Sequence, residues 1–259
     1  MSYVDLHCHL LPGLDDGAAT NEDMLRHARR LHAEGVRDVA CTPHVKRDEF
    51  PGVPIRELAD RVNAAQALIA RAGLAVRLHA GAELAHPDAL SLSELDLARI
   101  AQGPPDHRWL LLECPFEGFD DEFALACRRL HSLGYGLLLA HPERTAGMMS
   151  DDGLQRLHLL LAQGVLLQVN VCSLLGNHGL DAQDASVRLV REGLAYCLAS
   201  DAHPGSREQT LQLGFHLLLR AGASSTQAYR LTQANPRLLL RDGVTRALVD
   251  LERALAAAA

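Results

Sequence analysis

The sequence predicts an α/β fold, a distorted (β/α)7 TIM-like barrel in which seven parallel strands alternate with helices. Three observations support this prediction. Short apolar runs alternate with longer helical patterns along the chain. Most of these runs are apolar throughout, which is typical of parallel strands buried on both faces by helices. Several helical patterns end in a glycine just before the next apolar run. An open doubly wound sheet is the alternative arrangement.

Each element follows from a local pattern. Strands are predicted at residues 3–7, 37–42, 75–82, 109–113, 136–140, 165–170 and 194–200. Helices are predicted at residues 21–34, 54–73, 120–134, 151–163, 181–192 and 206–221, with two more near 225–233 and 244–257. Thr20 precedes the first helix and Asp23 follows three residues later, which is close to a capping box. The glycines that end helical patterns are Gly35, Gly73, Gly134, Gly164 and Gly193.

Length and composition narrow the class of protein. The chain has 259 residues, of which 48% are hydrophobic, so it fits a globular fold and not a disordered one. Its net charge of −7 argues against non-specific nucleic-acid binding as the main task. No apolar run is long enough to span a bilayer, and the first residues lack the pattern of a secretory signal. We therefore expect no nucleic-acid partner and no membrane insertion.

The cysteines point to a compartment. Six are scattered along the chain without a CxxC pair, which suits buried thiols in a reducing cytoplasm. We therefore expect a cytoplasmic protein. The oligomeric state is left open by the sequence.

Imidazoles and carboxylates follow six of the seven predicted strands, at the point where each strand ends. Because the C-terminal ends of parallel barrel strands meet on one face, we expect these side chains to lie together. Residues i and i+2 of an extended segment point to the same side, so His7 and His9 can bind one metal ion. Imidazole and carboxylate ligands suit Zn, Mn or Fe. The residues at the strand ends are His7, His9, Asp15, Asp16, His44, Glu83, Glu113, His141, Asp201 and His203.

A single histidine in a loop is more often a solvated surface residue than a ligand, so only the full set at the strand ends carries weight. His86 and Pro87 follow no predicted strand, and we predict a loop there. His178, in the loop after the sixth strand, could border the pocket. Five histidines in helical patterns are predicted to lie on the surface or in helix packing, namely His27, His32, His131, His158 and His216.

The ordered motifs resemble those of the PHP (polymerase and histidinol phosphatase) superfamily. They read DLHCH…DDG, TPH, GAE, LLECPF, AHPER, QVN and SDAH, and the resemblance spans about residues 3–240. Within the superfamily the chain is most similar to the bacterial capsule- and exopolysaccharide-associated tyrosine phosphatases, through HLLPGLDDGA, LLECPF, AHPER, QVNVCSLLG and SDAH. The resemblance implies a single PHP-type phosphoesterase domain over residues 1–259.

The resemblance also implies three divalent metal ions at the C-terminal ends of the strands, with Mn²⁺ expected and Fe or Zn as alternatives. The implied ligands are His7, His9, Glu83 and Asp201 for the first ion, Glu83, Glu113 and His141 for the second, and Asp16, His44 and His203 for the third. Glu83 would bridge the first two ions, and Asp15 is an alternative to Asp16.

The activity implied by the resemblance is that of a metal-dependent protein-tyrosine phosphatase. Its substrate would be phosphotyrosine on a bacterial tyrosine autokinase that regulates capsular or exopolysaccharide synthesis. Attack would be in line, by a metal-bridged hydroxide. Arg144 and Arg207 would bind the substrate phosphate, Arg47 and its neighbour Lys46 occupy a further substrate-binding position, and His203 is a candidate proton donor. The alternatives are a small-molecule phosphatase such as histidinol-phosphate phosphatase, a PHP-type nuclease, and a non-catalytic interaction protein.

Cys41 and Arg47 superficially match the spacing of cysteine-based tyrosine phosphatases. The phosphate loop of those enzymes uses backbone N–H groups, whereas the intervening segment here includes Pro43, which has none. We therefore predict that Cys41 is a buried thiol at a strand end and takes no part in catalysis.

Overall fold

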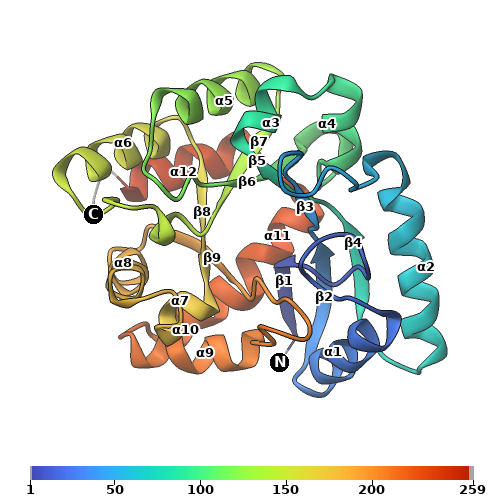
Figure 1. Ribbon diagram of the computed structural model, residues 1–259. Coiled ribbons are helices and arrows are strands. Elements are labelled where there is room, and N and C mark those ends of the chain that lie inside the picture. Colours follow the sequence, from blue (N-terminus) through green and yellow to red (C-terminus); the bar gives the residue numbers. More distant parts are fainter. Residues whose placement is uncertain (1, 257–259) are drawn as a thin grey trace.

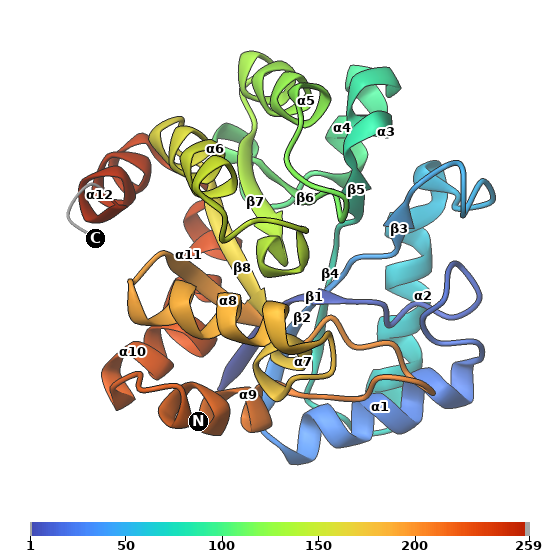
Figure 2. The same ribbon diagram turned by 60° about the vertical axis from the view of Figure 1, so that its left-hand side comes forward.

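The computed structural model describes residues 2–256, and its strands form two parallel sheets that together surround one interior (Figures 1 and 2). The smaller sheet has the order β1-β2-β4 and the larger one β3-β5-β6-β7-β8-β9. The strands are β1 (Tyr3–Cys8), β2 (Val36–Cys41), β3 (His44–Val45), β4 (Arg77–Ala80), β5 (Glu83–Ala85), β6 (Trp109–Glu113), β7 (Gly136–Ala140), β8 (Leu166–Asn170) and β9 (Ala195–Ala199).

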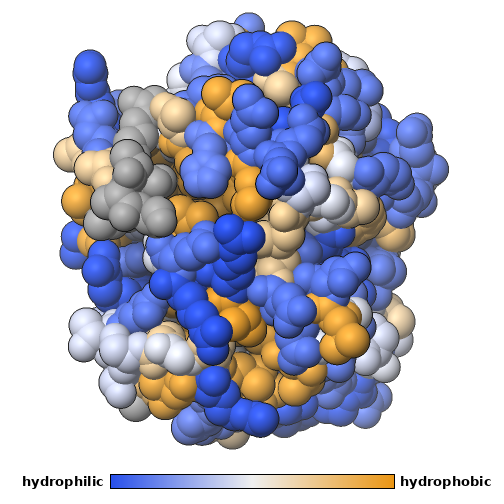
Figure 3. Space-filling model, turned by 90° about the vertical axis from the view of Figure 1, so that its left-hand side faces the viewer, coloured by the Kyte–Doolittle hydropathy of each residue, from blue (hydrophilic) through white to orange (hydrophobic). Residues whose placement is uncertain are grey.

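Helices cover the outside of the strands (Figure 2). They are α1 (Asn21–Ala33), α2 (Leu58–Arg71), α3 (His86–Ser91), α4 (Glu94–Ile100), α5 (Asp121–Ser132), α6 (Asp151–Ala162), α7 (Val171–Leu175), α8 (Leu180–Arg191), α9 (Leu211–Arg220), α10 (Ser225–Tyr229), α11 (Asn235–Asp242) and α12 (Arg246–Ala256). On the face that includes α6, α8 and α12, hydrophilic residues surround several separate hydrophobic areas (Figure 3). Within residues 2–256, no helix is both long and apolar enough to cross a membrane.

Backbone hydrogen bonds join the two sheets at the C-terminal ends of their strands. On one side the chain passes from β2 into β3 and from β4 into β5, and Glu83 N donates to Pro43 O at 3.1 Å. On the other side Asp201 N donates to His7 O at 2.8 Å, and His9 N donates to Ala202 O at 2.9 Å. The strand ends therefore form a continuous ring, as the predicted distorted barrel requires.

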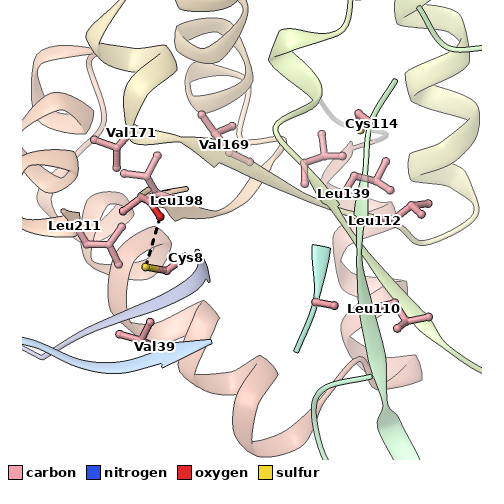
Figure 4. Packing of buried hydrophobic residues seen from close by; sticks show 14 of the residues in the cluster. Cys8, Val39, Leu110, Leu112, Cys114, Leu139, Val169, Val171, Leu198 and Leu211 are labelled. Carbon is pink, nitrogen blue, oxygen red and sulfur yellow. Dashed lines mark hydrogen bonds between the residues drawn. The ribbon is translucent and has the colours of Figure 1, made fainter. Parts of the chain in front are cut away.

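The buried residues separate into an interior cluster and an outer layer. The outer layer packs the outward faces of the strands against the helices, as at Leu112, Leu139 and Val169 (Figure 4). The interior cluster contains Trp109 and Leu239, and the indole N–H of Trp109 donates to Leu239 O at 3.1 Å. Since Leu239 belongs to α11, this helix closes the interior at the end opposite the C-terminal ends of the strands.

A register shift in β1 turns His7, and His9 just after the strand, towards the interior. Asp5 pairs with Val39 and Cys8 pairs with Cys41, so three residue steps in β1 match two steps in β2. Because side chains alternate between the faces of a strand, an extra residue of this kind reverses which ones face the interior. Leu6 lies in the interior cluster, while Cys8 packs in the outer layer (Figure 4). His7 and His9 are therefore both available to the interior.

Most of the predicted elements are confirmed, including the capping box of Thr20 and Asp23 and positive φ angles at the helix-ending glycines. Two features differ. The predicted strand 75–82 ends at Ala80, and the chain resumes pairing only as β5, so His86 directly follows a strand and starts α3 where a loop was predicted. The predicted helix 206–221 begins only at Leu211. The first residues of the predicted helix are not helical. Arg207 instead forms an antiparallel bridge with His203, with backbone hydrogen bonds of 2.7 and 2.8 Å.

The other elements that sequence patterns did not predict are short. They are β3, α4, α7 and α11, of which α4 begins at an N-cap, Ser93, whose side chain accepts from Asp96 N. Residue 257, where the last predicted helix ends, lies outside the described residues.

Gly17 is required because its backbone passes very close to that of His9. It follows Asp15 and Asp16, and a Cβ atom at this position would clash with the carbonyl oxygen and Cβ of His9. We expect Gly17→Ala to destabilise the chain by about 2 kcal/mol through overpacking, measured by chemical denaturation. Gly52→Ala is the matched control, because a Cβ there meets no atom within 4 Å. Equal stability of the two variants would contradict this account.

His27 makes the folded chain sensitive to acid. It lies fully buried on α1, and neither ring nitrogen has a hydrogen-bond partner among the described residues. Burial lowers its pKa from 6.5 to about 4. The unfolded chain therefore binds a proton more readily, so stability is complete above pH 6.5 and falls as the pH drops towards 4, by up to about 3 kcal/mol.

We expect His27→Leu to remove this loss of stability between pH 6.5 and 4, measured as the free energy of unfolding across that range. His158→Leu is the control, because His158 is exposed on α6. An unchanged pH slope in His27→Leu would show that another group causes the acid sensitivity.

Candidate functional site

The predicted metal-binding side chains converge at the C-terminal ends of the strands. Eight of the nine fall into three overlapping groups, in each of which the donor atoms lie within 4.8 Å of one another. The ninth, His141, places Nε2 2.8 Å from Glu83 Oε1. The groups are His7, His9, Glu83 and Asp201; His9, Asp16, His44 and His203; and His44, Glu83 and Glu113. Glu83, His9 and His44 each belong to two groups, so neighbouring positions share donors.

The first group has the spacing of a metal cage. His7 Nε2 and His9 Nε2 lie 3.2 Å apart, and each lies 3.2–3.3 Å from Glu83 Oε2. Asp201 Oδ1 lies 3.3 Å from both nitrogens. Five of the six distances among these four atoms are thus 3.2–3.3 Å, and a tetrahedron with edges of this length has its centre about 2 Å from each atom, the usual distance of nitrogen and oxygen ligands from zinc. All four residues are buried.

A hydrogen-bond chain determines which nitrogen of His7 faces this centre. Asp201 as a carboxylate only accepts, so Asn170 Nδ2 donates to Asp201 Oδ2 at 2.7 Å. The amide oxygen of Asn170 then accepts from Gln168 Nε2 at 2.7 Å. Gln168 Oε1 accepts in turn from His7 Nδ1 at 2.9 Å. The lone pair of His7 therefore lies on Nε2, which points at the other members of the group.

His9 is oriented by Asp15 in the same way. Its Nδ1 donates to Asp15 Oδ2 at 2.7 Å, which leaves a lone pair on Nε2 as well. Two lone pairs 3.2 Å apart need a positive charge between them. Burial alone lowers the pKa of His7 and of His9, but the carboxylates around them outweigh burial and raise both values. The position thus favours a cation, as a metal site does.

The second group distinguishes Asp15 from Asp16. The carboxylate of Asp15 is occupied by His9 and by the backbone N–H groups of Gly17 and His44. Asp16 instead points to two imidazoles, with Oδ1 3.1 Å from His203 Nε2 and 3.5 Å from His44 Nε2. Its side chain is 51% exposed. The geometry favours Asp16 as the ligand and Asp15 as the residue that orients His9.

The carboxylates of the third group have opposite pKa shifts. Burial alone would raise the pKa of Glu83, but the imidazoles of His7 and His44 hold it well below its usual range. Burial, together with the charge of Glu83, raises the pKa of Glu113 to about 7. Lys46 places its ammonium group near this carboxyl, with Nζ 3.8 Å from Glu113 Oε2. A divalent ion beside Glu83 and Glu113 would favour the charged form of both.

Two members of the site have strained backbones. His141 has φ 38° and directly follows β7, and Asp201 has φ 47° and lies two residues after the end of β9. The left-handed region is unfavourable for residues other than glycine and is concentrated at functional sites. The strain turns both side chains towards Glu83 and His7, with which they make contacts of 2.8 and 3.3 Å.

A cavity of about 130 Å³ opens over the groups, and two of the predicted arginines line it. Arg144 Nη1 lies 3.6 Å and Arg207 Nη2 3.7 Å from Asp201 Oδ2. Arg207 reaches the site because its backbone pairs with that of His203. Arg47 does not line this cavity: its backbone N–H and side chain contact Asp88, at 2.9 and 3.5 Å, and it borders a neighbouring cavity. Substrate binding by Arg47 therefore stays a prediction, whereas its neighbour Lys46 lines the central cavity.

His203 and His178 differ in their relation to the cavity. Burial lowers the pKa of His203, which favours the neutral ring of a metal ligand over a proton donor. His178 lines another cavity of about 540 Å³ that it shares with Arg144, and its Nδ1 lies 2.9 Å from Ser173 Oγ. It therefore borders a second cavity next to Arg144 and does not line the central one. Cys41 is fully buried at the end of β2, and burial raises the pKa of its thiol, so it is not a reactive thiolate.

Sequence reasoning missed the roles of Gln168, Phe50 and Phe116. Gln168 stands two residues before Asn170 on β8, and this i, i+2 spacing is the signal that could have placed it on the interior face. Phe50 and Phe116 lie in loops after β3 and β6 and line the central cavity. Their loops carry no periodic pattern that would have indicated this.

Comparisons with known proteins agree with the fold and identify the family. A family model described as "Capsular polysaccharide synthesis, CpsB/CapC" matches residues 3–241, and the chain belongs to this family. The tyrosine-protein phosphatase YwqE of Bacillus subtilis is 31% identical over an alignment of 251 residues, and the match covers 92% of this chain and 92% of YwqE. The putative tyrosine-protein phosphatase CapC of Staphylococcus aureus is 28% identical and covers 77% of this chain and 76% of its own.

A solved structure is similar over nearly the same length. It comes from a study of YwqE from Bacillus subtilis and CpsB from Streptococcus pneumoniae, described as unique metal-dependent tyrosine phosphatases. It has a TM-score of 0.76 and 28% identity, and the match covers 93% of this chain and 94% of that one. This chain therefore shares its fold with a metal-dependent tyrosine phosphatase of known structure. It also contains clusters of side chains suited to binding metal ions.

The different contacts of Asp15 and Asp16 generate a paired prediction. We expect Asp16→Asn to lower the number of metal ions bound per chain, because it removes a charged donor from the second group. Asp15→Asn should keep the number but weaken binding by about 10- to 100-fold, as changes behind a ligand do. Metal content after dialysis and titration calorimetry measure the two effects. The reverse pattern would identify Asp15 as the ligand.

Proposed function

We propose that this chain is a metal-dependent protein-tyrosine phosphatase that hydrolyses phosphotyrosine on a bacterial tyrosine autokinase controlling capsular or exopolysaccharide synthesis. The observation that carries the proposal is the convergence of three imidazole and carboxylate groups below a cavity lined by Arg144 and Arg207. The names of the relatives and the description of the family support the substrate and the pathway. We take residues 1–259 as one phosphoesterase domain that acts in the cytoplasm, in keeping with its six free cysteines.

The side chains fit three divalent ions, of which we favour Mn²⁺. The fit rests on the cage spacing of the first group and on two buried atoms, His44 Nδ1 and Glu83 Oε2, which lie 3.0 Å apart without hydrogen-bond geometry, as two ligands of one ion would. Such ions lower the pKa of bound water and offset the negative charge of phosphate. The nine residues proposed to hold them are His7, His9, Asp16, His44, Glu83, Glu113, His141, Asp201 and His203.

Arg144 and Arg207 would bind and orient the phosphate group. Both guanidinium groups lie within 3.7 Å of the same oxygen of Asp201, Oδ2, so they converge on one side of the cavity. Guanidinium groups bind phosphate oxygens through paired N–H donors, and a fixed cation stabilises charge that develops during transfer. A phenolate has a pKa of about 10, so a tyrosine ester leaves with less help from an acid than an alkyl ester does.

A phosphatase assay of the metal-loaded chain tests the proposal. We expect manganese-dependent hydrolysis of a phosphotyrosine peptide, with much slower turnover of a phosphoserine peptide and of histidinol phosphate. A chelator should abolish activity, and added Mn²⁺ should restore it. Cys41→Ser should retain most activity, because the thiol is buried and protonated.

Each alternative has a distinct outcome in the same assay. Faster turnover of histidinol phosphate would replace the proposal with a small-molecule phosphatase, and cleavage of single-stranded DNA with a nuclease. Loss of activity in Cys41→Ser, combined with resistance to the chelator, would overturn the metal mechanism.

A further inference from the structure

Two phenyl rings interrupt an otherwise polar cavity. Phe50 and Phe116 line the central cavity, and every other described residue in its lining is charged or polar. Both phenylalanines are partly exposed and come from loops, Phe50 after β3 and Phe116 after β6. A site that bound only inorganic phosphate would have no use for apolar walls, so these rings indicate an apolar part of the ligand.

The rings are held by the metal-binding side chains themselves. Phe50 stacks on His44 with a centroid distance of 5.1 Å and an interplanar angle of 3°. Phe116 stacks on His141 at 5.8 Å and 18°, and the guanidinium carbon of Arg144 lies 4.5 Å from its centroid. Each ring therefore has a fixed orientation before any ligand binds.

The two rings stand on either side of Glu83. His44 contacts one oxygen of this carboxylate at 3.0 Å, and His141 contacts the other at 2.8 Å. The phenyl rings stack on these two imidazoles and are more exposed than Glu83, so they line the cavity on both sides of the buried carboxylate. Lys46 Nζ lies 5.8 Å from the centroid of Phe116 and adds positive charge at the same level.

We propose that Phe50 and Phe116 select aryl over alkyl phosphate esters by holding the ring of the ester between them while its phosphate reaches the polar floor. The inference rests on the proposed phosphatase function and identifies the residues that would give it its substrate class. A tyrosine side chain is long enough to pass two walls and still present its phosphate at the floor. A serine phosphate is shorter, and it would bring the polypeptide backbone against the rings without filling the space between them.

Aryl and alkyl phosphate esters also differ in how readily their leaving groups depart, which affects the rate of hydrolysis. Binding of non-hydrolysable phosphonates avoids this difference and tests the inference directly. We expect the manganese-loaded chain to bind phenylphosphonate more tightly than methylphosphonate in titration calorimetry. In the double variant Phe50→Leu/Phe116→Leu the preference should fall about tenfold, because two aromatic contacts are lost while apolar volume is kept. Binding of methylphosphonate should stay within about twofold, since it depends on the polar floor.

Two further variants separate a ring contact from a general structural effect. Phe50→Tyr/Phe116→Tyr keeps both rings and should keep the phenylphosphonate preference. Phe119→Leu is the matched control, because Phe119 lies in the same loop as Phe116 but stacks on Phe123 at 5.6 Å, away from the cavity lining. Its phosphonate preference should equal that of the unchanged chain.

The outcomes distinguish this inference from the proposed function. An unchanged preference in the double leucine variant, or no preference in the unchanged chain, would overturn the role of the two rings even if phosphotyrosine is hydrolysed. A tenfold loss of preference in a chain that fails to hydrolyse phosphotyrosine would support the aryl-binding role and reject the phosphatase proposal.

Discussion

The site depends on carboxylates and imidazoles that are buried away from bulk solvent and compensate the charge of one another. Glu83 and Asp201 are almost completely buried, and their negative charge is tolerated because His7 and His9 stand within 3.3 Å. The hydrogen-bond chain from Asp201 through Asn170 and Gln168 then orients the imidazole of His7. This series of hydrogen bonds connects two proposed metal ligands, Asp201 and His7. A change in the protonation of Asp201 would therefore alter the hydrogen bond that orients His7.

Local irregularities of the barrel backbone, at the C-terminal ends of its strands, produce this arrangement. The register shift in β1 turns two histidines inward, and the positive φ angles after β7 and β9 turn His141 and Asp201 towards Glu83. Below this level the interior is filled with apolar side chains such as Leu111 and Leu138. The polar groups are therefore confined to the C-terminal ends of the strands, where the neighbouring loops can form a cavity.

The sequence allowed prediction of those elements and residues whose positions follow a repeated hydrophobic pattern. Uniformly apolar runs predicted the parallel strands, and the positions after them predicted the side chains that converge. It could not predict β3 and β5, because strands of two or three residues carry no periodicity, nor the register shift, which depends on pairing with β2. The placement of Lys46 instead of Arg47 in the cavity depends on Asp88, which is distant in sequence and has no local signal.

The single tryptophan of the chain is placed where it can report on one event alone. Trp109 is fully buried and bonded to the carbonyl of Leu239 on α11, at the closed end of the barrel. Phe50, Phe116 and the proposed ligands stand at the opposite end. Intrinsic fluorescence of this protein should therefore follow the docking of α11 and the integrity of the interior, while loading of metal ions leaves the indole in the same surroundings. Folding and metal uptake can thus be observed separately in the unmodified chain.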